Sequence, residues 1–336
     1  MPGYRPSGIL HWVLPKLRVD AWALIGCIGT EERSFTAWKT LCRLQLLSAT
    51  QLVRVAPESK NRHAQKNDAL WQQSLAEFKK QGGDQKDINE VKLLVPYGQI
   101  VQWVDDFLSR GHENIVVDIS GLPKRFFFPI VRRILDHIPL VKNIVATYTR
   151  AGSYPDAPLA ENPADWDHLP LFSGRAEYKP PSPQALVIGV GFEPLGLQGH
   201  VEQGDLPLKL LLPFPSPPQE YRRSWELARL LQKNRKPEHV RLFRTHPYDP
   251  SDTFDRLTNL TQGGKSTILL APYGPKPMSL GMCLFARLTE TAAYYTQPVA
   301  YLPNYSESVA MLDGQPLTYA YCLRLQERDV FAIPTP

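Results

Sequence analysis

Two short turns of this 336-residue chain combine glycine with hydroxyl, acidic and basic side chains. One directly follows the apolar run 21–28, and the other directly follows the apolar run 115–119. Each turn precedes a segment of helical periodicity, and the free N–H groups of a helix start, together with Lys or Arg, bind anions. The sequence therefore predicts a phosphate or nucleotide site here. Its candidate ligand-binding residues are Thr30, Arg33, Ser34, Ser120, Gly121, Lys124 and Arg125.

The second half of the chain carries a similar pair of turns. One follows the glycine-containing apolar run 185–191, and the other follows the run 267–271. Prolines at 272, 275 and 277 stiffen the latter, because each fixes its own φ angle. A rigid glycine turn that holds a lysine at a strand end is typical of an anion-binding loop. The candidates in this half are Glu193, Arg244, Tyr273, Gly274 and Lys276.

Carboxylates in the first pair of turns allow an alternative, enzymatic interpretation. Glu31 or Glu32 would act as general base or nucleophile on a nucleotide or nucleoside, with Asp118 as the second carboxylate. His246 could carry a proton. The structural interpretation is that Glu31 stabilises a helix start and pairs with Arg33, that Asp118 caps its turn, and that Lys124 and Arg125 lie on a solvated face. Glu31, Glu32 and Arg33 could instead hold the two turns together, and they would then shape a pocket.

Other motifs do not support a defined catalytic or metal site. Residues 263–267 resemble the end of a Walker A loop, but the earlier glycine is missing and the segment precedes a strand. Residues 189–199 depart from GxGxxG at Pro194. No zinc, serine-hydrolase or kinase spacing occurs, and the four cysteines are scattered. We expect no metal. The sequence leaves the cofactor open, with a nucleotide as a candidate.

The elements that position these turns alternate along the chain. Apolar runs of about five residues alternate with longer amphipathic segments, which is typical of a parallel sheet covered on both faces. Residues 28–31 match 190–193, and residues 121–124 correspond to 274–276. The sequence therefore predicts an α/β protein with two doubly wound, Rossmann-like parallel-sheet domains related by degenerate internal duplication. Chance similarity between two α/β domains is the alternative.

Prolines indicate where the domains divide. Seven of the 32 fall between 155 and 183, and four more fall between 213 and 218. Proline is excluded from the interior of helices and ladders, so both stretches are predicted to be loops or linkers. We expect domain 1 over 1–151, a proline-rich linker over 152–184 and domain 2 over 185–336. Either proline stretch could instead bind a partner in extended form.

Composition narrows the class of protein. No apolar run is long enough to span a membrane, and the N-terminus has prolines and charges where a signal peptide is apolar. Scattered cysteines suit a reducing compartment, so we expect a cytoplasmic location. The net charge of +5 is compatible with an anionic ligand but does not indicate nucleic acid.

The turn with Gly29, Glu31, Glu32, Arg33 and Ser34, and the strand ending in residues 118–121 with Lys124 behind it, carry a resemblance. On these motifs the chain resembles the Rossmann-like domains of bacterial antiviral defence proteins, including CARF-type sensors of cyclic nucleotides. The resemblance covers about residues 20–150, with an echo over 185–305. Since the two Rossmann-like units take up both halves, it implies that a partner protein supplies or receives the output.

These observations lead to one main expectation and two alternatives. The main expectation is a nucleotide- or phosphate-binding sensor or regulatory subunit of a larger, antiphage-type assembly, without catalysis of its own. It would bind an anionic small molecule and a protein partner. The first alternative is a nucleotide- or nucleoside-processing enzyme that uses Glu31 and Asp118. The second is a structural interaction subunit of a larger complex.

Overall fold

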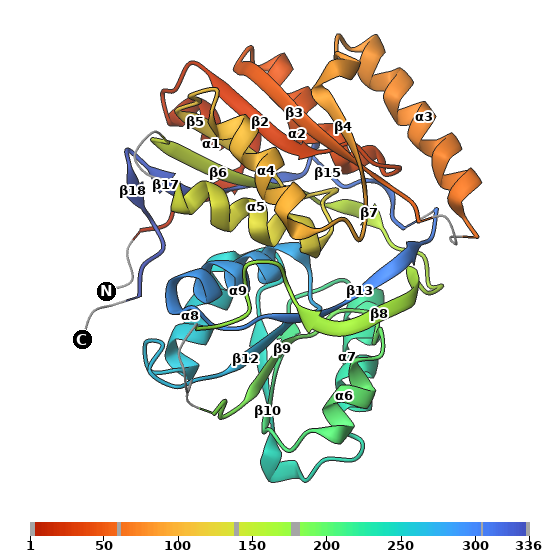
Figure 1. Ribbon diagram of the computed structural model, residues 1–336, viewed down its shortest axis with the longest axis vertical. Helices are drawn as coiled ribbons and strands as arrows, with labels where there is room; N and C mark the ends of the chain where they lie inside the picture. The colour runs from red at the N-terminus through yellow and green to blue at the C-terminus, as the bar shows by residue number, and fades with distance from the viewer. Residues whose placement is uncertain (1–3, 59–61, 138–140, 176–181, 304, 334–336) are drawn as a thin grey trace. The chain divides into compact units, whose positions relative to one another are not determined.

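The computed structural model describes residues 4–58, 62–137, 141–175, 182–303 and 305–333 (Figure 1). The chain divides into two compact units. Unit 1 contains the described residues up to 161 together with 299–331, and unit 2 contains 162–298 with the last described residues, 332 and 333. The sequence-based boundaries, 1–151 and 185–336, therefore differ from the observed ones, because the C-terminal segment returns to unit 1.

The sheet of unit 1 has five parallel strands at its centre, in the order β4-β3-β2-β5-β6. Numbered along the chain, this order is 3-2-1-4-5, as in doubly wound folds. The parallel strands are β2 (Trp22–Cys27), β3 (Leu47–Ala56), β4 (Ile88–Lys92), β5 (Asn114–Asp118) and β6 (Asn143–Thr149). Beyond β6, the sheet continues antiparallel with β17 (Thr318–Leu325), β1 (Ser7–Ile9) and β18 (Arg328–Asp329). The sequence pattern did not reveal these antiparallel strands.

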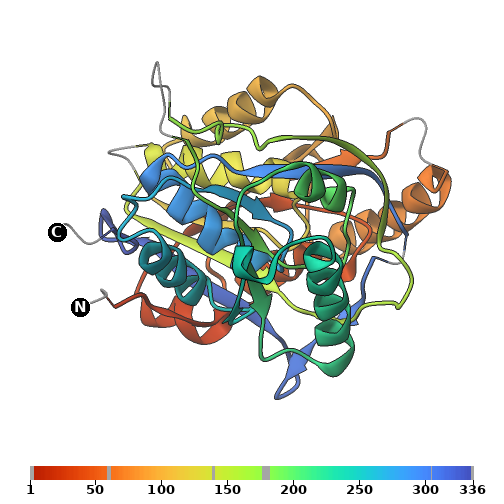
Figure 2. The same ribbon diagram turned by 90° about the horizontal axis from the view of Figure 1, so that it is seen from below.

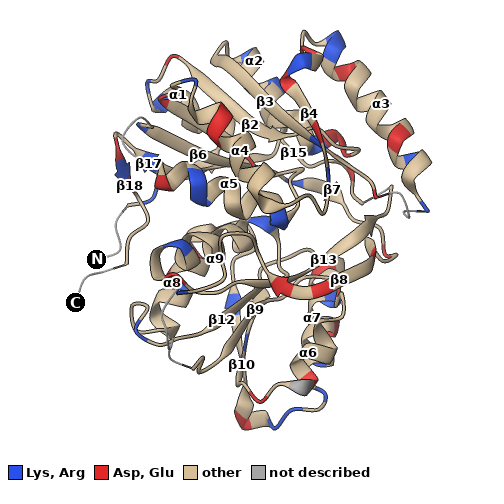
Figure 3. Ribbon diagram, viewed as in Figure 1, with Lys and Arg blue, Asp and Glu red and all other residues tan. Residues whose placement is uncertain are grey.

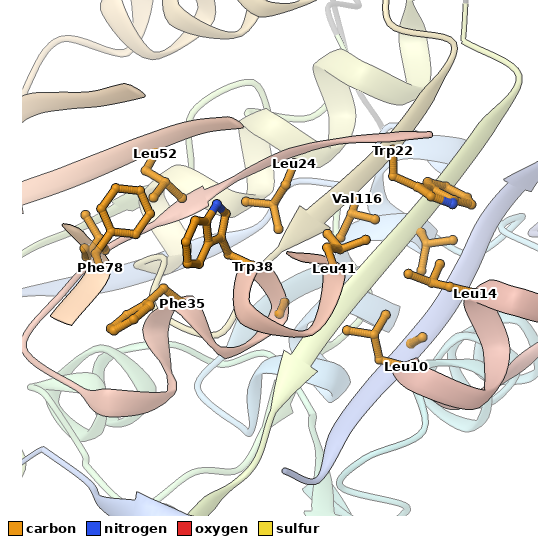
Figure 4. Packing of buried hydrophobic residues seen from close by; sticks show 14 of the residues in the cluster. Leu10, Leu14, Trp22, Leu24, Phe35, Trp38, Leu41, Leu52, Phe78 and Val116 are labelled. Atoms are coloured by element: carbon orange, nitrogen blue, oxygen red, sulfur yellow. The ribbon is translucent and has the colours of Figure 1, made fainter. Parts of the chain in front are cut away.

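Helices cover both faces of this sheet. On one face, the indole of Trp38 in α2 (Thr36–Arg43) donates to Thr50 Oγ1 at 3.2 Å, and α1 (Leu10–Lys16) and α3 (Ala64–Lys80) join the same apolar cluster (Figure 4). On the other face, Gln51 Nε2 donates to the carbonyl oxygen of Trp103 in α4 (Tyr97–Leu108) at 2.7 Å. Helix α5 (Lys124–Asp136) packs beside α4 through an Arg133–Asp105 ion pair of 2.6 Å. Since adjacent strand residues face opposite sides, these contacts establish a sheet buried on both faces.

Short elements complete unit 1 and connect it to unit 2. They are the 3-10 turns η1 (Glu32–Phe35) and η2 (Gln85–Asp87), the pair β7 (Ala151–Ser153) and β14 (Glu307–Val309), and the hairpin β15 (Met311–Leu312) with β16 (Gln315–Pro316). Strands β8 (Ala160–His168) and β13 (Tyr294–Tyr301) pair, and each runs from one unit into the other.

The predicted linker over 152–184 is therefore partly strand. Pro163 lies within β8, where the sequence analysis predicts only loop. A two-stranded pairing leaves one edge of each strand open, so a proline there removes no ladder bond on that side. Residues 176–181 of this linker lie outside the described residues.

Unit 2 repeats the strand order of unit 1 in a smaller sheet. Its four parallel strands lie in the order β11-β10-β9-β12, which is 3-2-1-4 along the chain. They are β9 (Leu186–Gly189), β10 (Leu208–Pro213), β11 (Val240–Thr245) and β12 (Leu269–Pro272). A parallel bridge between Leu270 and Ala293 brings the start of β13 beside β12. The central strands of both sheets are parallel, as the sequence predicts.

The helices of unit 2 also lie on both faces of its sheet. Helices α6 (Leu197–Gln203) and α7 (Pro218–Gln232) pack on the apolar face that contains Leu208, Leu210 and Leu212, and they lie side by side in both views (Figures 1 and 2). Helix α9 (Lys276–Thr289) packs on the opposite face, and α8 (Pro250–Leu260) packs against α9. A Cβ at Gly189 would lie 3.0 Å from Met282 Sδ of α9. A turn η3 (Pro237–His239) precedes β11.

Both units thus belong to the mixed α/β class, each built on a parallel sheet. Within the described residues, no helix has the length and apolar character needed to cross a membrane. Basic and acidic residues are distributed over the elements of both units (Figure 3).

Candidate functional site

The strand order places a topological switch point between β2 and β5 of unit 1. The chain leaves these neighbouring strands in opposite directions along the sheet, and open α/β sheets bind ligands at that point. The structure brings the two predicted turns together there. A Cβ at Gly121 would lie 3.0 Å from Ser34 Cβ and 3.3 Å from Cys27 Cβ. Ser34 Oγ accepts from the backbone N–H of Gly29 at 3.0 Å instead of capping a helix.

Arg33 fixes the first turn from inside the protein. Its side chain is 2% exposed, and its guanidinium binds Glu31 Oε2 through Nε at 2.9 Å and Nη2 at 2.8 Å. Nη1 donates to the hydroxyl of Tyr148 and to the carbonyl of Thr149, both at 3.3 Å. Burial disfavours the charge, but Glu31 and the neighbouring tyrosines outweigh it, so the pKa of Arg33 stands well above its usual value. Arg33 and Glu31 therefore form the ion pair that the structural interpretation predicts.

Aromatic and hydroxyl groups from distant segments surround this ion pair. The hydroxyls of Tyr148 and Tyr154 lie 3.3 Å apart, and Arg33 Cζ lies 5.6 Å and 6.0 Å from the centres of their rings. Burial raises the pKa of Tyr154 well above its usual value. Ser306, just before β14, donates its hydroxyl to Glu31 Oε2. Sequence reasoning missed these residues, because no short motif links Ser306 or Tyr154 to position 31.

Asp118 anchors the second turn. It is 1% exposed, and its Oδ1 accepts from the backbone N–H of Ser120 at 3.0 Å and from Ser120 Oγ at 2.5 Å. Ser120 Oγ in turn accepts from the N–H of Thr149 at 2.7 Å, which ties the turn to β6. A Cβ at Gly26 would lie 3.2 Å from Asp118 Cβ, so the glycine in β2 leaves room for this carboxylate. Asp118 caps its own turn, which is the structural interpretation.

The basic residues of the second turn open helix α5. Lys124 is its first residue and is 8% exposed, so the predicted solvated face is wrong for this lysine. Arg125 is half-buried and donates to the carbonyl of Val95 at 3.0 Å. Of the remaining candidates in this region, Thr30 is half-buried and Glu32 is exposed.

Unit 2 has its switch point between β9 and β12, where backbone packs on backbone. A Cβ at Gly191 would lie 2.0 Å from the carbonyl oxygen of Tyr273, and a Cβ at Gly274 would lie 3.2 Å from that of Val190. The Tyr273 hydroxyl lies 2.5 Å from Thr296 Oγ1, and burial raises the pKa of Tyr273 to about 12. Lys276 is the first residue of α9 and is half-buried. Gly274 and Lys276 thus occupy the same position in unit 2 as Gly121 and Lys124 in unit 1.

Three further candidates of unit 2 serve neighbouring elements. Glu193, after β9, accepts from Arg223 Nη2 of α7 at 2.6 Å. Arg244 lies in β11 and His246 follows that strand, and β10 and β9 separate β11 from β12. His246 Nδ1 accepts from the N–H of Tyr248 at 3.2 Å, so its ring organises the loop before α8. The structure does not bring Arg244 and His246 to the strand pair that holds Lys276.

The polar side chains at the two switch points are mostly bonded within the protein. Across the ranges the structure describes, no cluster of three or more His, Cys, Asp or Glu side chains could hold a metal ion. Arg33, Ser34, Ser120 and Tyr273 are buried, and their printed bonds hold the turns in shape. The turn backbones and the starts of α5 and α9 lie at the carboxyl ends of the strands, where open α/β sheets bind ligands.

Comparison with known proteins does not assign the chain to a family. No protein-family model matches the sequence, and no curated protein matches it either.

Proposed function

We propose that the chain binds a nucleotide or another phosphate-bearing small molecule at the carboxyl ends of β2 and β5, with a corresponding position at β9 and β12. One observation carries this proposal. At each switch point a glycine-containing turn lies against a second turn that ends in Pro-Lys, and the lysine opens a helix of 13 or 14 residues.

The helix starts supply the attraction for an anion. The residues at the N-caps of α5 and α9 are Pro123 and Pro275, and neither makes a side-chain capping bond. The positive end of each helix dipole, together with the adjacent Lys124 or Lys276, favours a negatively charged group. Glycine in the facing turn allows a ligand close to the backbone.

The bonds of the carboxylates favour binding over catalysis. Glu31 is held by Arg33 and Ser306, and Asp118 by Ser120. A general base needs an oxygen directed at the substrate, and each carboxylate accepts these bonds from its own protein. We therefore infer a binding protein, with the enzyme as the alternative.

The shared strand order favours the proposed degenerate duplication. Both sheets have the order 3-2-1-4, and both place the Gly–Pro–Lys turn after the fourth strand. Two related units offer two positions for one ligand type. In line with the defence-protein resemblance, we propose that the protein is a sensor or regulatory subunit whose output passes to a partner protein.

Calorimetric titration of the purified protein tests this proposal. ATP, AMP, cyclic di-AMP and inorganic phosphate are the probes, with Lys124→Ala and Lys276→Ala as variants. Lys142→Ala and Lys236→Ala are matched controls, because both exposed lysines precede strands and so lie at the amino ends of β6 and β11. We expect a site variant to weaken binding at least ten-fold and the controls to leave it unchanged.

Two results would contradict the proposal. The first is absence of binding by every probe. The second is binding that neither site variant alters, with melting temperatures showing that both variants fold. Chromatography of each nucleotide after incubation tests the enzyme alternative, which predicts turnover that Glu31→Gln or Asp118→Asn abolishes.

A further inference from the structure

The outer strand β11 of unit 2 has an open edge that carries charge. Among the described residues, only β10 pairs with β11. The strand reads Val-Arg-Leu-Phe-Arg-Thr, and three of its side chains are exposed: Arg241, Leu242 and Arg244. Leu242 is 41% exposed, although it lies on the face of the sheet that α7 covers elsewhere. An exposed strand edge is a template for pairing with another extended chain.

A row of aromatic rings starts beside this edge at Phe214. The ring centre of Phe214 lies 5.9 Å from that of Tyr221, which lies 6.4 Å from that of Trp225. Phe214 is 41% exposed and Trp225 is 38% exposed. The guanidinium of Arg244 lies over the Phe214 ring, with Cζ 4.7 Å from its centre. Aromatic residues and Arg are the types most enriched at protein interfaces.

The two arginines of β11 have no acidic partner. Neither guanidinium lies within 4.0 Å of a carboxylate anywhere in the described part of the chain. By contrast, Arg223 of α7 pairs with Glu193 at 2.6 Å. Lys209, opposite Arg241 on β10, adds a third cation, and burial and Arg241 lower its pKa. The open edge therefore carries positive charge that no carboxylate of the described residues pairs with.

The charge pattern argues against a second copy of this chain. A strand pair made from two copies of β11 would bring four guanidinium groups together with no carboxylate, since the strand has no acidic residue. Like charges opposite each other destabilise a strand pair. Nucleic acid is less suited, because it has no peptide backbone that could pair with the open edge of a strand. The Arg244 carbonyl already accepts from Arg256 Nη2 of α8 at 3.2 Å, so the backbone bonds that the open edge offers to a peptide lie mainly along Val240 and Leu242.

We propose that the β11 edge and the adjoining aromatic row dock an extended, acidic segment of a partner protein, which adds to the sheet as a fifth strand. Arg241 and Arg244 are three residues apart, so they lie on opposite faces of the sheet. The fitting segment therefore carries two acidic residues with the same i, i+3 spacing and an apolar residue between them against Leu242. This is addition of a strand to a sheet edge.

Fluorescence anisotropy with synthetic peptides tests the proposal on the full chain. The probe is a labelled, end-capped hexapeptide, Val-Asp-Leu-Val-Glu-Val. Three matched peptides replace the acids with Asn and Gln, move them to i, i+2 spacing, or N-methylate alternate residues so that backbone bonding fails. Variants are Arg241→Glu/Arg244→Glu and Trp225→Ala, and Arg222→Glu is the control because it is an exposed arginine of α7 beside Glu226.

We expect the probe to bind at least ten-fold more tightly than each matched peptide. The double charge reversal should weaken it at least ten-fold and make a Lys-substituted peptide the better ligand. Trp225→Ala should weaken it about three-fold, and Arg222→Glu should not alter it. Amide exchange should slow over 240–245 when the probe binds.

Four outcomes would overturn the proposal. They are no saturable binding of the acidic peptide at millimolar concentration, equal binding of the N-methylated peptide, tighter binding of oligothymidylate, and self-association of the chain that the charge reversal abolishes. The last two would assign this edge to nucleic acid or to a second copy. All variants change exposed residues, and circular dichroism confirms their folding.

Discussion

The switch points of the two units share a strand order but are held together by different chemistry. In unit 1, side chains join the turns: Arg33 binds Glu31, and Ser120 links Asp118 to β6. In unit 2, the turns meet through glycine, with Gly191 against the carbonyl of Tyr273. The same topology therefore tolerates two solutions, one polar and one dependent on the absence of side chains.

The strands beneath the turns show the same contrast. In unit 1, Gly26 lies beside Asp118, and in unit 2, Ile188 pairs with Ala271. Asp118 and Ala271 each stand three residues before the glycine of the turn. In both units, a large residue on one strand faces a small one on the other, so the volume between the strands is conserved. Only unit 1 uses that volume for a carboxylate.

Arg33→Met should have the largest effect on stability. It leaves Glu31 and its neighbours without their buried cation, and breaking a buried ion pair costs about 3–5 kcal/mol. Arg223→Met in unit 2 should cost about 1 kcal/mol, because its pair with Glu193 is more exposed. Urea unfolding measures both, and hydrogen exchange locates the loss. Equal losses would remove the contrast between the units.

The same ion pair predicts a flat pH response. The pKa of Arg33 is raised, so its contribution to stability is complete below the pKa that arginine has in the unfolded chain and is lost only as pH rises through the higher pKa of the folded state. The difference between wild type and Arg33→Met should therefore stay constant from about pH 6 to pH 9.

Gly191→Ala should have the next largest effect, a loss of about 3 kcal/mol in the free energy of unfolding. Its Cβ would lie 2.0 Å from a backbone oxygen, so the turn must move. Gly121→Ala in unit 1 meets the Cβ of Ser34 at 3.0 Å and that of Cys27 at 3.3 Å, so the turn must give by only a few tenths of an ångström, and the loss should be about 1 kcal/mol. Gly199→Ala, a helical glycine with no atom within 4 Å, is the control and should be neutral or stabilising. A milder effect at 191 than at 121 would contradict the backbone packing.

Asp118→Ala should cost about 2 kcal/mol, because the buried N–H and hydroxyl of Ser120 lose their acceptor. Asp106→Ala on the exposed face of α4 serves as the control and should change the free energy of unfolding by less than about 0.5 kcal/mol. Thermal melts of both variants provide the measurement. A loss for Asp118→Ala no larger than that of the control would show that this carboxylate does not hold the turn.

Tyr273→Phe should have the smallest effect at neutral pH, about 1 kcal/mol for the lost hydroxyl contact with Thr296. At alkaline pH this stability advantage of the wild type over the variant should shrink. Burial raises the pKa of Tyr273 to about 12, so the stability it contributes is complete below pH 10 and is lost as pH rises through 12. Over that pH window, the free energy of unfolding measured with urea should fall more steeply for the wild type than for the variant. Parallel curves would show that Tyr273 ionises without affecting the fold.

Periodicity in the sequence was enough to predict the central strands and most helices. The apolar runs 21–28, 115–119, 185–191 and 267–271 correspond to β2, β5, β9 and β12. The antiparallel strand β17 was missed, because an antiparallel neighbour needs no crossover helix that would indicate it in the sequence. Its return to β6 also moved the domain boundary.

The features of the candidate site also divide into those that the sequence predicted and those that only the structure revealed. Local sequence located the turns, since glycine, proline and lysine punctuate strand ends, and it offered the Arg33–Glu31 pair from its close spacing. It could not show that Lys124 is buried or that Tyr154 and Ser306 enclose Glu31 and Arg33. Those facts depend on contacts between residues far apart in the chain.

By itself, the sequence determined which segments become buried strands, where their turns fall and which side chains those turns carry, because these follow from local hydrophobic periodicity and the restricted backbone of Gly and Pro. Only the tertiary structure decided which strands are neighbours, which carboxylates are occupied and which strand edge is left open. Those outcomes follow from packing between distant segments. A charged side chain that becomes buried, such as Arg33, must bond to other groups of the protein, whereas Arg241 and Arg244 are not covered and face solvent.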